Sequence, residues 1–151
     1  MRSTGEKHPP PSDPDAGIWR GHSVARRFVS PDGWVVLAGR TAEDNDVLTF
    51  RLAAPQDFWL HVSGESGSHV VVRNPDRLDR LPRDTLQFAA ALAARHSKAR
   101  KAGTVTVHLT TCVEVSKPRG SAPGKVTLRH FRGIRVRPAD GDQSSDSTHD
   151  P

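Results

Sequence analysis

Cations with the spacing of an anion-binding site gather in the second half of this chain. Between Arg95 and Arg137 the sequence carries eleven Lys and Arg residues and one acidic residue, Glu114. Within this stretch, residues 117–125 combine three cations with two prolines and two glycines. Such a composition predicts an exposed loop with few conformations, whose cations and backbone N–H groups could bind phosphate oxygens. An ordinary basic loop between two strands is the alternative.

A second group of cations lies at the end of a predicted helix. Residues 83–101 carry apolar side chains at helical spacing, many of them alanine, and Gly103 is the candidate C-cap. On a helix, His96 and Arg100 are neighbours one turn apart, and the nearby cations repel one another. An anionic ligand would relieve that repulsion, although a solvated helix end has the same pattern. The cations in question are Arg95, Lys98, Arg100 and Lys101.

Histidines mark a predicted hairpin in the middle of the chain. Residues 58–62 and 68–73 are apolar runs that flank a glycine-rich loop at 63–67, which is typical of two paired strands. If the pairing is symmetric about the loop, His61 lies opposite His69, and Trp59 shares the face of His61. Aromatic rings on such a face could stack on unpaired bases. The structural alternative is a core position for Trp59 and a core or edge position for His61.

The same two histidines also allow a metal hypothesis. Two imidazoles across a hairpin could bind zinc if Asp57 or His108 supplied a third ligand. The spacing matches no known zinc signature, and nothing in the sequence fixes the third ligand.

The remaining pattern predicts an α+β domain with a mostly antiparallel sheet, one long helix and one short helix. Residues 31–33 are a turn between strands at 23–30 and 34–38. Thr41, followed by Asp44, starts a short helix that ends before Pro55, although residues 47–52 could instead form a strand. Residues 104–109 form a strand with 113–115 as a possible partner, and residues 126–131 and 134–136 form a closing hairpin that turns at 132–133.

Composition separates this domain from both ends of the chain. Residues 1–17 hold four prolines, and residues 139–151 are polar and acidic, so we expect a disordered N-terminal segment and a disordered acidic tail. The formal net charge is +5, of which residues 18–138 hold +10, because both ends are negative. A folded basic domain of this kind attracts polyanions, of which RNA, DNA and an anionic membrane are the candidates.

Several classes are excluded by what the sequence lacks. The single cysteine, Cys112, cannot form an intrachain disulfide or a multi-cysteine zinc site. The first residues lack the apolar stretch of a signal peptide, and no run is long enough to cross a bilayer, so we expect a cytoplasmic protein with no membrane partner. No nucleophile elbow or phosphate-binding loop is present. We therefore expect no enzymatic activity, no cofactor and no bound metal.

Taken in order, these motifs resemble the NFACT RNA-binding domain over about residues 26–138. The likeness is carried by GRTAEDND at 39–46, LTF at 48–50, DFWLHV at 57–62, GSHVVVR at 67–73, SKAR at 97–100, KPRG at 117–120 and PG at 123–124. In that family the domain is one part of larger proteins that bind the large ribosomal subunit carrying a stalled peptidyl-tRNA and help to extend the nascent chain. The other family domains have no counterpart in these 151 residues, so we expect a stand-alone version, with a partner protein as one source of the missing domains.

The resemblance implies that this module contacts RNA, with rRNA or tRNA on the large ribosomal subunit as the expected partner and ribosome rescue, quality control or translation as the setting. An enzyme centred on His61 and His69 and a module that docks on a ribosomal protein are the alternatives. The predicted RNA-contacting residues are Arg40, Trp59, His61, His69, Arg95, Lys98, Arg100, Lys101, Lys117, Arg119 and Lys125.

Overall fold

A six-stranded antiparallel sheet, in the order β10-β7-β5-β6-β4-β3, forms the centre of the protein. The computed structural model describes residues 8–138. It confirms the predicted α+β class, with a mostly antiparallel sheet, a long helix and a shorter one. The strands of the sheet are β3 (Ala25–Val29), β4 (Val35–Gly39), β5 (Phe58–Val62), β6 (Val70–Val72), β7 (Val105–Thr111) and β10 (Arg132–Val136).

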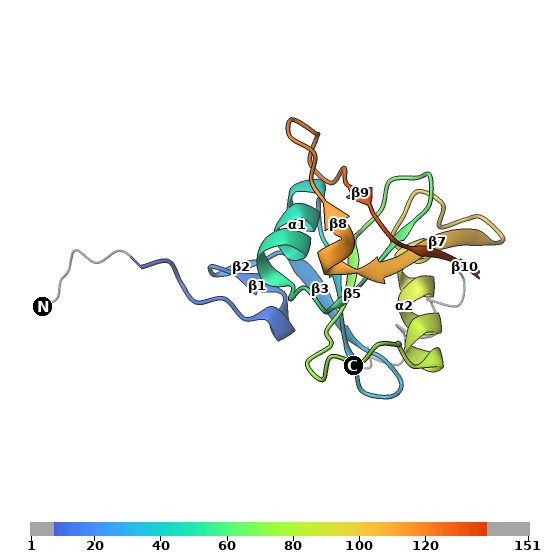
Figure 1. Cartoon of the computed structure of the whole chain (residues 1–151), viewed down its shortest axis with the longest axis horizontal. Helices are drawn as coiled ribbons and strands as arrows, with labels where there is room; N and C mark the ends of the chain where they lie inside the picture. Colours follow the sequence, from blue (N-terminus) through green and yellow to red (C-terminus); the bar gives the residue numbers. More distant parts are fainter. Residues whose placement is uncertain (1–7, 139–151) are drawn as a thin grey trace, which may run out of the picture.

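Both faces of the sheet are covered by helices, as Figure 1 shows. The long helix α2 (Arg83–Arg95) packs on one face, where its alanines allow close approach to Val36, Phe58 and Leu60. The short helix α1 (Ala42–Val47) continues into the π-helical turn η2 (Leu48–Leu52), and Leu48 and Leu52 pack on the other face. Because side chains of a strand alternate between faces, the central strands β4, β5 and β6 are buried on both sides.

The shorter helix begins where the sequence predicts. The backbone N–H of Asp44 donates to the side-chain oxygen of Thr41 (3.0 Å), which caps the first turn. At its end, the N–H of Ala53 donates to the carbonyl of Leu48 (2.9 Å), the wider spacing of a π turn. The strand alternative for residues 47–52 is therefore wrong, and Thr49 points into the protein, where it is buried.

The histidine hairpin has the predicted register. Leu60 pairs with Val70 between β5 and β6, and the next residue on each side of this pair is a histidine, His61 and His69. The two imidazole rings are 5.5 Å apart between centroids, and the ring of Trp59 lies 5.8 Å from that of His61. All three rings therefore share one face of the sheet.

The long helix ends earlier than predicted, at Arg95 instead of near residue 101. After the helix the chain bonds to the hairpin loop: the N–H of Ser68 donates to the carbonyl of His96 (2.9 Å) and the N–H of Lys98 donates to that of Ser66 (2.8 Å). A Cβ on Gly67 would lie 2.6 Å from the Cβ of Ser97, so only glycine permits this close crossing. These hydrogen bonds to the hairpin loop take the place of further helical hydrogen bonds. The prediction that Gly103 caps the C-terminus of α2 is therefore wrong.

The C-terminal pairing also differs from the prediction. The strand β10 pairs with β7, and Val136 packs against the core under α2, so residues 126–131 and 134–136 do not form a hairpin. Residues 113–115 do not pair with β7, because the 3₁₀ turn η3 (Cys112–Glu114) turns the chain away. A separate small sheet joins β8 (Val115–Ser116) to β9 (Thr127–Leu128), and the loop between them projects from the body (Figure 1).

At the N-terminal side, residues before the predicted boundary at Ile18 already form regular structure. A 3₁₀ turn, η1 (Pro14–Ala16), precedes the small β1 (Ile18–Trp19) and β2 (His22–Ser23) pair, and Asp15 bonds to Arg73 (2.9 Å). The rest of the predicted N-terminal segment, residues 1–7, and the predicted acidic tail, 139–151, lie outside the described residues. Within residues 8–138, no helix has the length and apolar character that crossing a membrane requires.

Candidate nucleic-acid interface

Five cations line an open hollow of about 480 Å³ where β3, the start of α1 and the segment after α2 meet. Arg26 comes from the edge strand β3, Arg40 from the turn before α1, and the other three from the end of α2 and the segment that follows it. No acidic residue lines this hollow among those that the structure describes. We call it the basic hollow; its cations are Arg26, Arg40, Arg95, Lys98 and Arg100.

Hydrogen bonds between neighbouring segments fix the walls of the basic hollow. Asn45 accepts from the N–H of His69 (3.0 Å) and donates to the carbonyl of Gly67 (3.2 Å), and Ser68 donates to the carbonyl of Gly39 (2.7 Å). A Cβ on Gly39 would lie 2.0 Å from the side-chain oxygen of Asn45, so glycine is required for α1 to approach β4. The cations are therefore presented on a preformed surface.

The pKa of His96 reflects the positive charge around the basic hollow. Its pKa lies below the ordinary value because the ring is partly buried and because the charges of Arg26 and Arg95 oppose its protonation. Arg26, Arg40, Lys98 and Arg100 are all exposed to solvent. The arrangement gathers positive charge that an anion would neutralise, and four of these cations (Arg40, Arg95, Lys98 and Arg100) belong to the predicted contact set.

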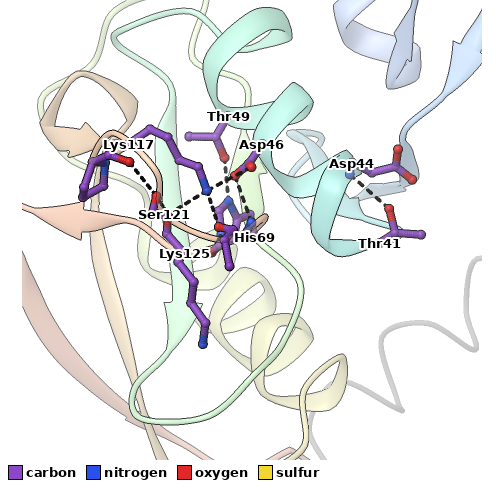
Figure 2. A network of polar contacts seen from close by, with 11 residues as sticks. Thr41, Asp44, Asp46, Thr49, His69, Lys117, Ser121 and Lys125 are labelled. Carbon is purple, nitrogen blue, oxygen red and sulfur yellow. Dashed lines mark hydrogen bonds and ion pairs between the residues drawn. The ribbon is translucent and has the colours of Figure 1, made fainter.

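The proline- and glycine-rich loop at 117–125 is held by its own lysine. The ammonium of Lys117 lies 3.1 Å from a carboxylate oxygen of Asp46 and donates to the carbonyls of Ala122 and Lys125. These three acceptors use all three of its N–H groups. The predicted phosphate contact at Lys117 is therefore corrected: the residue joins the loop to α1, as Figure 2 shows. We call residues 117–125 the clamped loop.

Two other predicted contacts lie inside the core. Trp59 and His69 are 1% and 0% exposed, so both belong to the core and the predicted RNA contact at each is wrong. For Trp59 this is the structural alternative that the sequence offered. The indole N–H of Trp59 donates to the hydroxyl oxygen of Thr49 (3.1 Å), and this hydroxyl lies 2.8 Å from Nδ1 of His69. On the other side of the ring, Nε2 lies 3.1 Å from the carbonyl oxygen of Gly124.

The direction of this chain of hydrogen bonds follows from its two ends. Because a carbonyl can only accept, Nε2 of His69 carries the proton, and Nδ1 accepts from Thr49. Burial, together with the neighbouring His61, lowers the pKa of His69 to about 4, so the ring is neutral. Asp46 accepts from the N–H of Gly124 (3.1 Å), so both backbone groups of Gly124 are held and the clamped loop is joined to the core (Figure 2).

A second open hollow, of about 680 Å³, adjoins the basic hollow. His61, His108 and Phe131 contribute aromatic rings to it, and Lys125 adds a cation whose side chain points away from the network in Figure 2. Burial lowers the pKa of both His61 and His108. We call it the aromatic hollow; the residues that line both hollows are Ala42, Asn45, Ser66, Gly67 and Lys98.

The other predicted contacts lie apart, and three lining residues were missed. Lys101 and Arg119 are exposed but line neither hollow. Arg26, His108 and Phe131 were not predicted. A signal for Arg26 was available, because a hairpin symmetric about residues 31–33 pairs Arg26 with Ala38, which brings it near Arg40.

The predicted zinc alternative lacks its ligands. Both ring nitrogens of His69 are already bonded, and Asp57 accepts from Arg73 and from the backbone N–H groups of Ala54 and Asn74. Among residues 8–138, no three His, Cys, Asp or Glu side chains are grouped as metal ligands would be. Cys112 is buried, which raises the pKa of its thiol, so it is not a reactive nucleophile.

An antiparallel sheet with a preformed basic surface is the kind of domain that binds nucleic acid, and the comparisons with known proteins give the family. Residues 25–130 match the family described as NFACT protein RNA binding domain. The chain therefore belongs to the NFACT RNA-binding domain family, as the sequence motifs indicated.

Relatives and a solved structure agree with this assignment. The chain is 38% identical over 117 residues to the Rqc2 homolog RqcH of Bacillus subtilis, covering 76% of this chain and 20% of that protein. It is 32% identical over 107 residues to the ribosome quality control complex subunit NEMF homolog of Drosophila melanogaster, covering 68% of this chain and 11% of that protein. The match thus spans about a fifth of the length of the bacterial relative.

The fold also matches the C-terminal part of the fibronectin/fibrinogen-binding protein from Streptococcus suis. The TM-score is 0.73 at 34% sequence identity, over 80% of this chain and 48% of that structure.

Proposed function

We propose that this chain is a non-catalytic RNA-binding module that acts in ribosome quality control by contacting rRNA or tRNA on the large ribosomal subunit. The basic hollow is the observation that carries the proposal. Five cations from three separate segments line one preformed surface, and none of its lining residues within the described part of the chain is acidic. Surfaces of this kind bind the phosphates of nucleic acid.

The family and the relatives support the same proposal. The family description names RNA binding, and the Drosophila relative is a longer protein named as a subunit of the ribosome quality control complex. The proposal of a non-catalytic module is supported by the state of His69, Asp57 and Cys112, which are buried and already bonded or unreactive.

Salt dependence of RNA binding tests the proposal. Each neutralised phosphate contributes roughly one unit to the slope of log affinity against log salt concentration. We expect the wild-type protein to bind tRNA and large-subunit rRNA fragments with a steep slope, measured by fluorescence anisotropy. The double variant Arg40→Ala/Arg100→Ala should reduce that slope by about two.

A matched control separates a local surface from overall charge. Arg77 and Arg83 are exposed cations, and Arg83 starts α2 at the end opposite the basic hollow. The variant Arg77→Ala/Arg83→Ala therefore removes the same charge and should keep the wild-type slope. If both double variants lose the same amount of affinity, or if wild-type binding does not depend on salt, the proposed RNA-binding surface is wrong.

A further inference from the structure

We infer that the aromatic hollow receives one unpaired base of the bound RNA while the basic hollow holds the neighbouring phosphates. The inference rests on the proposed RNA binding and adds to it the class of substrate: a single-stranded or loop segment with an exposed base, and not a regular duplex.

Rings from three neighbouring parts of the sheet form one side of the aromatic hollow. His61 of β5 and His108 of β7 are paired residues, and the ring of Phe131 lies 4.4 Å from that of His108 between centroids. Phe131 comes directly before β10 and is 51% exposed. The ring of Phe131 therefore packs on His108 while about half of its surface stays exposed, and an exposed aromatic ring is well suited to stack on a base.

The charge of the aromatic hollow differs from that of the basic hollow. Its histidines are neutral near pH 7, because burial lowers the pKa of both His61 and His108. Glu65 also lines it, and a carboxylate there disfavours a phosphate but can accept a hydrogen bond from the amino group of a base. The aromatic hollow is thus suited to an uncharged flat group, and the basic hollow to anions.

The residues that line both hollows determine how one RNA strand could occupy the two hollows at once. Lys98 lines both hollows, and Lys125 lies on the aromatic one. A phosphate near Lys98 would therefore be next to the nucleotide whose base enters the aromatic hollow. In an A-form duplex the bases are stacked and paired, so none could enter, whereas an unpaired base can leave its stack and rest on aromatic rings.

Binding of matched RNA probes to the full chain tests the inference. The probes are a single-stranded heptamer, the same heptamer with abasic residues, and a duplex of the same length. Base stacking on an aromatic ring changes affinity by roughly 5- to 100-fold. We expect Phe131→Ala to weaken binding of the single strand by such a factor and to leave binding of the abasic probe and of the duplex unchanged.

Two further variants control for changes unrelated to stacking. Phe131→Trp should restore affinity for the single strand, because tryptophan also stacks. Val113→Ala removes another exposed apolar side chain, 53% exposed and outside both hollows, and should leave binding of all three probes unchanged.

The proposed function and the proposed base site would be contradicted by different results. Salt-dependent binding that is equal for all three probes, or equally weakened by Phe131→Ala for all three, overturns the base site alone. Absence of salt-dependent binding to every probe overturns the proposed function itself.

Discussion

Arg100 and Lys117 are both cations of the basic second half of the chain, but the structure uses them differently. Arg100 is exposed on the basic hollow, whereas the ammonium of Lys117 contacts Asp46 and two carbonyl oxygens of its own loop. Charge in a sequence therefore indicates an interface only where the fold leaves that charge available. The clamped loop uses its lysine for order, whereas Arg26, Arg40, Lys98 and Arg100 of the basic hollow are exposed to solvent.

The largest expected effect is a difference in the free energy of unfolding between a substitution beneath the clamped loop and one in the basic hollow. His69→Ala removes a fully buried ring that bonds Thr49 and Gly124, so it should lower the free energy of unfolding by about 3 to 4 kcal/mol. Arg100→Ala should change it by less than about 0.5 kcal/mol, because the side chain is exposed. Urea denaturation measures both. Equal losses for the two variants would remove the distinction between the regions.

Acid should weaken the attachment of the clamped loop. The pKa of His69 is about 4 in the folded protein and returns to an ordinary value near 6.5 on unfolding, so between these values the unfolded chain binds the extra proton. Stability is therefore lost as the pH falls from 6.5 towards 4, by up to about 3 kcal/mol from this residue. Because other groups also titrate, the comparison is with His69→Gln, whose unfolding free energy should depend less on pH over that range. An unchanged dependence would contradict the assignment.

Two lysines at the ends of one loop should respond in opposite ways. Lys117→Ala should cost about 1 kcal/mol of stability, since a partly buried ion pair and two hydrogen bonds are lost, without changing the salt slope of RNA binding. Lys125→Ala should leave stability unchanged and lower the slope by about one. Thermal melts and anisotropy titrations on both variants measure this. The reverse pattern would show that Lys117 contacts RNA.

The smallest expected effect is a pH dependence of RNA affinity. His96 is neutral in the free protein because burial and the nearby Arg26 and Arg95 lower its pKa. Bound phosphates would offset those charges and favour its protonated form, so affinity should rise as the pH falls from 8 to 6. His96→Gln should reduce the rise. A dependence that is the same in this variant would exclude His96 from the interface.

Local patterns predicted most of the fold. The cap at Thr41, the turn at residues 31–33 and the register that places His61 opposite His69 were all readable, because each depends on neighbouring residues. The end of α2 could not be predicted from local patterns. It depends on the close contact between Gly67 and Ser97, which lie far apart in the chain. The pairing of β10 with β7 was missed for the same reason: a short closing strand can pair with its neighbour in sequence or with a distant edge.

The candidate site was harder to predict than the fold. The sequence identified Arg40, Arg95, Lys98 and Arg100, but it could not show that the cations at the end of α2 share a surface with Arg26 and Arg40. Nor could it show that Lys117 is used internally, because its partner Asp46 lies far away in the chain. Trp59 and His69 share a strand face with His61, and only the packing of η2 over that face shows which ring is covered.

The most direct test is to map bound RNA on the molecule by NMR, with a short single-stranded oligoribonucleotide titrated into the isotopically labelled protein. If the basic hollow binds RNA, the backbone amides of its lining residues Arg40, Ser66, Gly67, Ser68, Lys98 and Arg100 should shift. Shifts confined to the 117–123 part of the clamped loop, with the amides around the basic hollow unchanged, would contradict this prediction.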